Sequence, residues 1–175
     1  MLIAVLADTH IPRRAADLPA TAWANLRGAD AIVHAGDVMA AGLLERLAAT
    51  KRLIAVRGNN DHLLDWLPER EEVELEGVRI GIVHDAGPVA GRRARLRRVF
   101  PFARVAVFGH SHVPLIEDDG SLLLLNPGSP TDRRRMPSYS MGMLSLHEGA
   151  VDGARIIDLG LERAARGVGS RLPNG

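Results

Sequence analysis

Seven residues of metal-binding type occur in short clusters, each placed directly after an aliphatic stretch of the sequence. The set comprises two carboxylates, one amide and four imidazoles: Asp8, His10, Asp37, Asn59, His84, His110 and His112. Oxygen donors mixed with imidazoles suit Mn²⁺, Fe, Zn²⁺ or Ni²⁺ better than Ca²⁺. Seven ligands are too many for one ion, whereas two ions that share a bridging carboxylate fit the count. The residue types therefore favour a two-metal site.

The aliphatic stretches that precede the first clusters are predicted to be β-strands. Strands at Leu2–Ala7, Ala31–Ala35 and Leu53–Val56 are separated by helical stretches at Pro19–Arg27 and Ala40–Ala49. This βαβαβ order predicts a parallel sheet in an α/β fold. Ligand sites in such sheets form at the carboxyl ends of the strands, where the connecting loops converge. We therefore expect the clusters to meet in space.

The second half of the chain predicts a hairpin, a third helix and a β-rich end. The hairpin covers Val73–Val83 with its turn near Gly77, and an arginine-rich helix at about 91–100 precedes a strand at Val105–Phe108. Four later stretches are predicted to be antiparallel strands: Leu115–Glu117, Leu122–Leu125, Tyr139–Leu146 and Ala154–Leu159.

Length and composition indicate one globular domain. The 175 residues suit a single hydrophobic core, which we place in residues 1–160, followed by a flexible C-terminal tail at 161–175. A hydrophobic fraction of 46% with 25% charged residues excludes a disordered or fibrous protein. Cysteine is absent, which excludes disulfides, thiolate metal ligands and a cysteine nucleophile.

The charge balance argues against a general affinity for nucleic acids or membranes. Lysine and arginine total 22 against 21 aspartates and glutamates, so the net charge is only +1. The chain also has no apolar run of about 18 residues and no signal-peptide pattern. We expect a cytoplasmic protein that binds anions only locally, and a homo-oligomer is compatible with the sequence.

Five ordered motifs resemble those of the calcineurin-like metallophosphoesterases. They are Asp8-Thr9-His10, Gly36-Asp37, Gly58-Asn59, His84 and Gly109-His110-Ser111-His112, which match D-x-H, G-D, G-N, H and G-H-x-H. Each motif alone is a weak signal, but five in order after predicted strands make coincidence improbable. The short length and Asn126-Pro127-Gly128-Ser129 further resemble the small bacterial and archaeal phosphodiesterases, which extends the match to about residue 146.

This resemblance implies two facing mixed β-sheets flanked by helices, and a phosphodiesterase that uses two divalent metal ions. One ion would be held by Asp8, His10, Asp37 and His112, and the other by Asp37, Asn59, His84 and His110. Manganese is the first choice, with nickel, iron, zinc or magnesium as alternatives. A hydroxide that bridges the ions would attack phosphorus in line, in a small-molecule or nucleotide phosphodiester.

Two positions depart from the resemblance. Many relatives have a proton-donating histidine where this chain has Asn60, and an asparagine side chain is no general acid. Asp61 and His62 are then the candidates for that proton-donating role, and Asn60 is a candidate both for the catalytic site and for contact with the substrate. Asp85 stands where relatives have glycine, and it could tune metal affinity or obstruct the substrate.

The arginines and the other histidines are expected to have different roles. Arg133 and Arg134, in a loop that the resemblance places near the metals, are candidates to bind a substrate phosphate. The run Arg92–Arg98 is predicted to be the solvated face of a helix buried through Ala94, Leu96 and Val99, and no nucleic-acid site. His34 is expected to be a packed strand residue, and His147 an exposed one.

Three alternative functions remain open from the sequence. A phosphomonoesterase or nucleotidase would use the same metals, and a non-catalytic scaffold would bind metals while it recognises a partner protein. A nuclease is the weaker third alternative. Filled ligand positions favour an enzyme over the scaffold.

Overall fold

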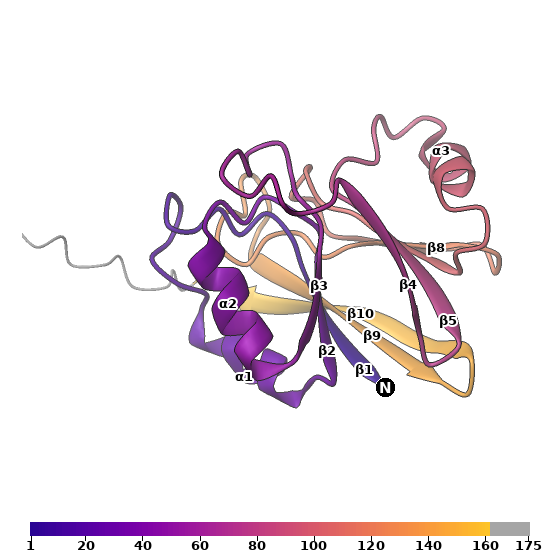
Figure 1. Ribbon diagram of the computed structural model, residues 1–175, viewed down its shortest axis with the longest axis horizontal. Coiled ribbons are helices and arrows are strands. Elements are labelled where there is room, and N and C mark those ends of the chain that lie inside the picture. The colour runs from indigo at the N-terminus through magenta and orange to yellow at the C-terminus, as the bar shows by residue number, and fades with distance from the viewer. Residues whose placement is uncertain (162–175) are drawn as a thin grey trace, which may run out of the picture.

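Two five-stranded β-sheets face each other across a shared apolar core, as the computed structural model shows (Figure 1). The structure describes residues 1–161, so the predicted tail lies outside the described residues except for Leu161. Helices cover the outer face of each sheet. The predicted α/β fold of two facing mixed sheets flanked by helices is confirmed.

The first sheet has the strand order β10-β9-β1-β2-β3. Strands β1 (Leu2–Leu6), β2 (Ala31–His34) and β3 (Arg52–Ala55) run parallel, as the βαβαβ pattern predicts. Strand β9 (Tyr139–His147) pairs antiparallel with β1, and β10 (Ala150–Gly160) pairs antiparallel with β9. The amino-terminal and carboxyl-terminal segments of the domain are thus joined in one sheet.

The second sheet has the order β4-β5-β6-β8-β7. Strands β5 (Val78–Val83), β6 (Val105–Val107) and β8 (Leu123–Asn126) are parallel, and β4 (Arg70–Leu75) and β7 (Leu115–Asp118) form antiparallel edges. The prediction that the late strands are antiparallel is therefore wrong for one pairing, because β8 lies parallel to β6. A strand's partner across the sheet depends on distant chain segments, which local sequence patterns do not encode.

Alternation of side chains along each central strand builds the layers. In β1, Ile3 and Val5 pack between the two sheets, whereas Ala4 and Leu6 pack under the helices of the first sheet. These strands are therefore apolar on both faces, which is why they appear as continuous aliphatic runs.

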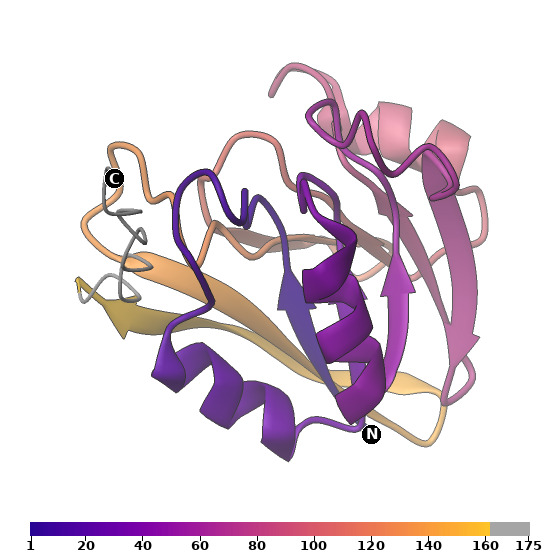
Figure 2. The ribbon, with the colours of Figure 1, turned by 60° about the vertical axis from the view of Figure 1, so that its left-hand side comes forward.

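Helices α1 (Ala20–Gly28) and α2 (Ala41–Thr50) cover the first sheet, side by side in Figure 2. Helix α3 (Arg92–Val99) covers the second sheet through Leu96, which packs with Phe100 of the following turn. Among residues 1–161 we find no helix that is long and apolar enough to cross a membrane.

The prediction that the arginines of α3 form a solvated face is wrong for most of them. Of its predicted buried residues only Leu96 is buried, whereas Ala94 and Val99 are exposed. Most of its arginines are half-buried and bind backbone carbonyls: Arg93 donates to Leu122, Arg95 to Ala86, Ala90 and Pro88, and Arg97 to Pro101, Ala103 and Ser121. The arginine run therefore fastens α3 to the neighbouring loops, because one short helix offers too few apolar residues for this purpose.

Candidate metal centre

The seven predicted ligands follow the carboxyl ends of five parallel strands. Asp8 and His10 come after β1, Asp37 after β2, Asn59 after β3, His84 after β5, and His110 and His112 after β6. Hydrogen bonds join these loops across the two sheets, such as the one from the His84 imidazole Nδ1 to the Ala35 carbonyl at 2.8 Å. The structure thus brings all seven residues to one place, as the strand-end argument predicts.

The first cluster combines Asp8, His10 and His112, whose donor atoms all lie within 4.8 Å of one another. The Nε2 atoms of the two histidines are 3.2 Å apart, and Nε2 of His112 is 3.5 Å from Oδ1 of Asp8. The His112 Nδ1–H donates to the Asp132 carbonyl at 2.5 Å. That contact fixes the tautomer and leaves the Nε2 lone pair directed at the cluster.

The second cluster combines Asp8, Asp37 and His84 within the same 4.8 Å limit. Because Nδ1 of His84 donates to a backbone carbonyl, its Nε2 is the atom that faces the cluster. Asn59 Oδ1 lies 3.0 Å from this Nε2 and 3.0 Å from Nδ1 of His110. Asn59 and His110 therefore lie beside the second cluster.

Asp37 lies between the two clusters. Its Oδ2 is 3.6 Å from Nε2 of His10 and 3.5 Å from Nε2 of His84. A single carboxylate oxygen thus reaches a histidine of each set, as a bridging ligand must. Asp8, which belongs to both clusters, lies at the same junction.

An unpartnered buried oxygen shows that this donor set fits a cation. Asp8 is fully buried, and its Oδ2 has no hydrogen-bond partner among the described residues. Burial raises the pKa of the Asp8 carboxyl to about 7, since no neighbour fully offsets the loss of water around its charge. A divalent ion would supply the missing partner and keep the carboxylate ionised.

The histidines of the first cluster are held in the neutral form that metal ions require. Burial lowers the pKa of His10 and brings the pKa of His112 to about 4, and the positive charge of Arg134 adds to both effects. His84 differs: burial opposes its protonation, but the hydrogen bond and charge of Asp37 outweigh burial and raise its pKa. The same pairing, together with Asn60, lowers the pKa of Asp37 despite the opposing effect of burial.

The backbone at the ligand positions is unusual. Five of the seven predicted ligands have positive φ: Asp8 at 57°, His10 at 44°, Asp37 at 59°, His110 at 66° and His112 at 58°. Residues other than glycine seldom adopt this left-handed region, and strained backbones of this kind cluster at functional sites. Sequence reasoning did not foresee this feature, because aspartate and histidine occur in every conformation.

Glycines next to the ligands are required for close approach. A Cβ at Gly58 would lie 2.1 Å from Oδ1 of Asp37, and a Cβ at Gly109 would lie 2.7 Å from the Ala7 side chain. Any side chain there would displace a ligand loop. This explains why each of these glycines directly precedes a polar residue of its motif.

The three candidates for catalysis occupy different environments. Asn60 is half-buried and donates to both carboxylate oxygens of Asp37. Asp61 is buried, and it accepts the backbone N–H groups of Asp37 at 2.8 Å, Gly58 at 2.7 Å and Met39 at 2.6 Å. His62 is exposed and lines a hollow beside Asn59.

The other residues considered in the sequence differ in their exposure and contacts. Arg134 is exposed and close enough to influence the pKa of His10, and Arg133 donates to the Met136 carbonyl at 2.5 Å. Asp85 is exposed and accepts the Gly87 N–H at 2.7 Å. His34 is fully buried, with Nε2 3.1 Å from the Thr9 hydroxyl, and His147 is exposed, so both of those predictions are confirmed.

Comparison with known proteins now identifies the family. Residues 1–149 match the calcineurin-like phosphoesterase superfamily domain. The chain belongs to this superfamily. It is 39% identical over 151 residues to a probable metallophosphoesterase of Methanocaldococcus jannaschii, an alignment that covers 85% of this chain and 77% of the relative. It is 25% identical over 146 residues to a phosphodiesterase of the same organism, with 73% and 83% covered.

The fold is also shared with a solved structure. Vps29 of Entamoeba histolytica, in a complex with Zn²⁺, superposes with a TM-score of 0.73 at 22% identity and covers 90% of this chain and 99% of its own. The predicted membership in the calcineurin-like superfamily is confirmed, and with it a metal-binding hydrolase of the phosphoesterase type.

Proposed function

We propose that the protein hydrolyses phosphodiesters at a two-metal centre. Asp8, His10, Asp37 and His112 would hold one divalent ion, and Asp37, Asn59, His84 and His110 would hold the other. The observation that carries this proposal is the position of Asp37 Oδ2, within 3.6 Å of a histidine nitrogen from each donor set. Manganese remains the first choice of metal, and a small-molecule or nucleotide diester the first choice of substrate.

The chain's own residues would organise the reaction. When bound, the ions would polarise the phosphoryl oxygens and lower the pKa of the attacking water. Asn60 would hold the Asp37 carboxylate in its bridging orientation. Asp61, with both carboxylate oxygens engaged by backbone amides, would fix the loops of Asp37 and Gly58 to each other.

The lack of a proton donor at position 60 favours diesters over monoesters. The Asn60 amide is too weak an acid to transfer a proton, and His62, exposed in the adjacent hollow, is the remaining candidate for this role. Substrates with good leaving groups need little protonation, so they would be cleaved fastest.

A second candidate is a metal-binding scaffold for a partner protein. Leu63 and Trp66 follow His62 in the chain, and they are 84% and 64% exposed. Contiguous exposed apolar patches mark protein interaction surfaces, and these two side chains are where such a patch would lie. The enzyme is favoured because every ligand position is filled.

The test is hydrolysis of bis(p-nitrophenyl) phosphate and p-nitrophenyl phosphate by metal-stripped protein, with Mn²⁺, Ni²⁺, Zn²⁺ or Mg²⁺ added back in turn. We expect metal to restore cleavage of the diester, and Asp37→Ala to abolish it. Faster cleavage of the monoester would instead identify a phosphomonoesterase. Bound metal without turnover of either ester would support the scaffold.

A further inference from the structure

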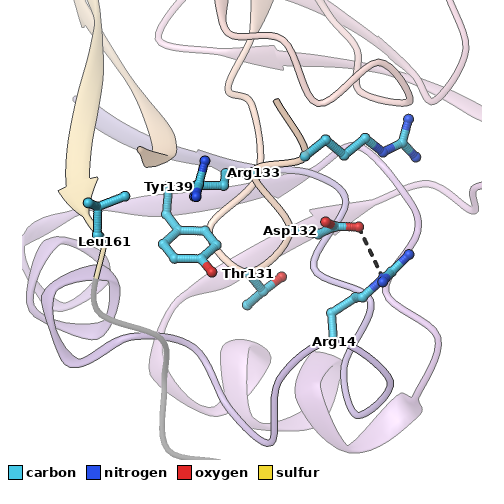
Figure 3. Close-up of a pocket in the computed structure, with 7 residues that line it drawn as sticks. Arg14, Thr131, Asp132, Arg133, Tyr139 and Leu161 are labelled. Carbon is cyan, nitrogen blue, oxygen red and sulfur yellow. Dashed lines mark ion pairs between the residues drawn. The ribbon is translucent and has the colours of Figure 1, made fainter. Parts of the chain in front are cut away.

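A hollow of about 380 Å³ opens beside the first ligand cluster (Figure 3). We call it the basic pocket, and its lining includes Arg14, Asp132, Arg133, Arg134, Tyr139 and Leu161. Figure 3 shows Tyr139 and Leu161 on one side of it, and Arg14 with Asp132 on the other. It adjoins the metal centre, because the Asp132 carbonyl accepts the His112 Nδ1–H and the Arg14 N–H donates to the His10 carbonyl.

The basic pocket carries positive charge without matching carboxylates. Arg14 is paired with Asp132, with 3.1 Å between Nε and Oδ2. Arg133 uses one guanidinium nitrogen on a neutral carbonyl, so its charge stays uncompensated. Among residues 1–161, no carboxylate lies within 4 Å of the guanidinium group of Arg133 or Arg134. Three guanidinium groups thus face one carboxylate, which makes the lining a site for an anion.

The basic pocket is rigidly joined to the metal ligands. The Ser129 hydroxyl donates to the Asp8 carbonyl at 2.7 Å, and the Thr131 hydroxyl donates to the Thr9 carbonyl at 2.5 Å. Both hydroxyls are buried. Arg134 itself has a φ of 49°, a left-handed conformation that the anchored loop imposes. An anion bound here would therefore lie at a fixed position relative to the ion sites.

The other side of the metal centre has the opposite character. A hollow of about 390 Å³ is lined by the ligands Asn59 and His84 together with three carboxylates, Asp61, Glu69 and Asp85. Among the described residues that line this hollow, Arg57 alone carries a guanidinium, and it is paired with Glu69 at 2.5 Å. A second anionic group is thus favoured on the basic side and disfavoured on this one.

We propose that the basic pocket binds a phosphate monoester carried by one arm of the phosphodiester substrate. The substrate class is then a diester with a second, terminal phosphate, of which a nucleotide arm is one chemical form. Tyr139 and Leu161 supply an apolar wall for the ring that links the two phosphates. This inference rests on the proposed function, and it assigns to Arg134 the second phosphate rather than the one that is cleaved.

The experiment compares thymidine 5′-(p-nitrophenyl phosphate) with the same compound bearing a 3′-phosphate. The two share one leaving group and differ only in the terminal phosphate. We expect the wild-type protein, with metal restored, to show a kcat/KM about tenfold or more higher for the phosphorylated compound. Arg134→Ala should remove this preference, so that the variant cleaves the two compounds with similar kcat/KM. The matched control is Arg27→Ala, an exposed arginine on α1, which should keep the preference.

Three kinetic results would overturn the inference and leave the proposed function intact. They are equal kcat/KM for both compounds, a preference that survives Arg134→Ala, and an equal loss on both compounds in that variant, which would place Arg134 on the cleaved phosphate. If neither compound is cleaved, the proposed function fails, and binding decides the inference. EDTA-treated protein should then bind thymidine 3′,5′-bisphosphate about tenfold more tightly than Arg134→Ala does, and equal Kd values would refute the pocket.

Discussion

Asn60 holds both carboxylate oxygens of Asp37. Its backbone N–H donates to Oδ1 at 2.8 Å, and its side-chain Nδ2 donates to Oδ2 at 2.7 Å. Hydrogen bonds to a charged acceptor are stronger than neutral ones, so this pair orients the carboxylate at the junction of the two donor sets. Asn60, whose amide cannot act as a general acid, is thus bound to the candidate bridging residue.

Removal of the Asn60 amide should weaken metal binding. In Asn60→Ala, Oδ2 of Asp37 loses its donor, and we expect metal affinity or diester turnover to fall about 10- to 100-fold. Calorimetric metal titration and initial-rate assays check this. Asn25→Ala is the matched control, since the Asn25 amide donates to the Thr21 carbonyl of its own helix, far from the donor sets in sequence. Equal behaviour of the two variants would show that the Asn60 contacts carry no function.

Substitution of Gly58 should displace Asp37. A Cβ there would lie 2.1 Å from Oδ1 and 2.4 Å from the backbone nitrogen of Asp37. We expect Gly58→Ala to lower metal affinity at least about tenfold and to destabilise the fold by roughly 1–3 kcal/mol. In Gly42→Ala, within α2, the new Cβ meets nothing within 4 Å, so that control should gain about 0.5–1 kcal/mol. Unchanged metal affinity in Gly58→Ala would contradict the geometry.

Asp61 should prove to be a positioning residue. Its carboxylate accepts three backbone N–H groups from the loops of Asp37 and Gly58. In Asp61→Asn, an amide group must face one of these donors, so we expect a loss of about 2–3 kcal/mol in urea unfolding, together with weaker metal binding. Asp65→Asn, at an exposed position, should change neither. If Asp61→Asn kept full stability and metal affinity but lost kcat, Asp61 would be the proton donor instead.

The sequence predicted the elements well because central strands buried on both faces leave continuous aliphatic runs. Strand β1, expected at Leu2–Ala7, spans Leu2–Leu6, and the expected hairpin forms β4 and β5. The gathering of ligands at strand ends followed from the same pattern. These features depend on local periodicity and on the geometry common to parallel sheets.

What the sequence did not predict depends on contacts between distant segments. The Ser129 hydroxyl meets the Asp8 carbonyl across 121 positions, and this contact places the basic pocket. Arg14 lines that pocket, where it pairs with Asp132, 118 positions along the chain. The parallel pairing of β6 and β8 is likewise invisible locally. Asp8 and Ser129 belong to sequence motifs, but the motifs do not show that these two residues meet.

Buried His34 should make the metal-free protein sensitive to acid. Burial lowers the pKa of its imidazole to about 3, whereas in the unfolded chain the value is near 6.5. The unfolded state therefore binds one more proton between these values. The free energy that the neutral His34 imidazole contributes to folding is fully present above about pH 6.5. It falls by up to about 1.4 kcal/mol per pH unit as the pH drops toward 3.

Urea unfolding in EDTA between pH 4.5 and 7.5 measures this slope. His34→Gln removes the titrating group, so the variant should show a shallower loss of stability on acidification than the wild-type protein. The exposed His147→Ala should retain the wild-type slope. Parallel pH profiles for wild type and His34→Gln would mean that His34 is not held neutral by burial.

The central claim is that two metal ions share Asp37, and the most direct measurement is the number of Mn²⁺ ions bound per chain. We predict two ions for the wild-type protein and for His147→Ala, and the loss of both in Asp37→Ala, because that carboxylate lies within 3.6 Å of a histidine nitrogen of each donor set. A single bound ion in the wild-type protein, or two ions retained in Asp37→Ala, would contradict the account.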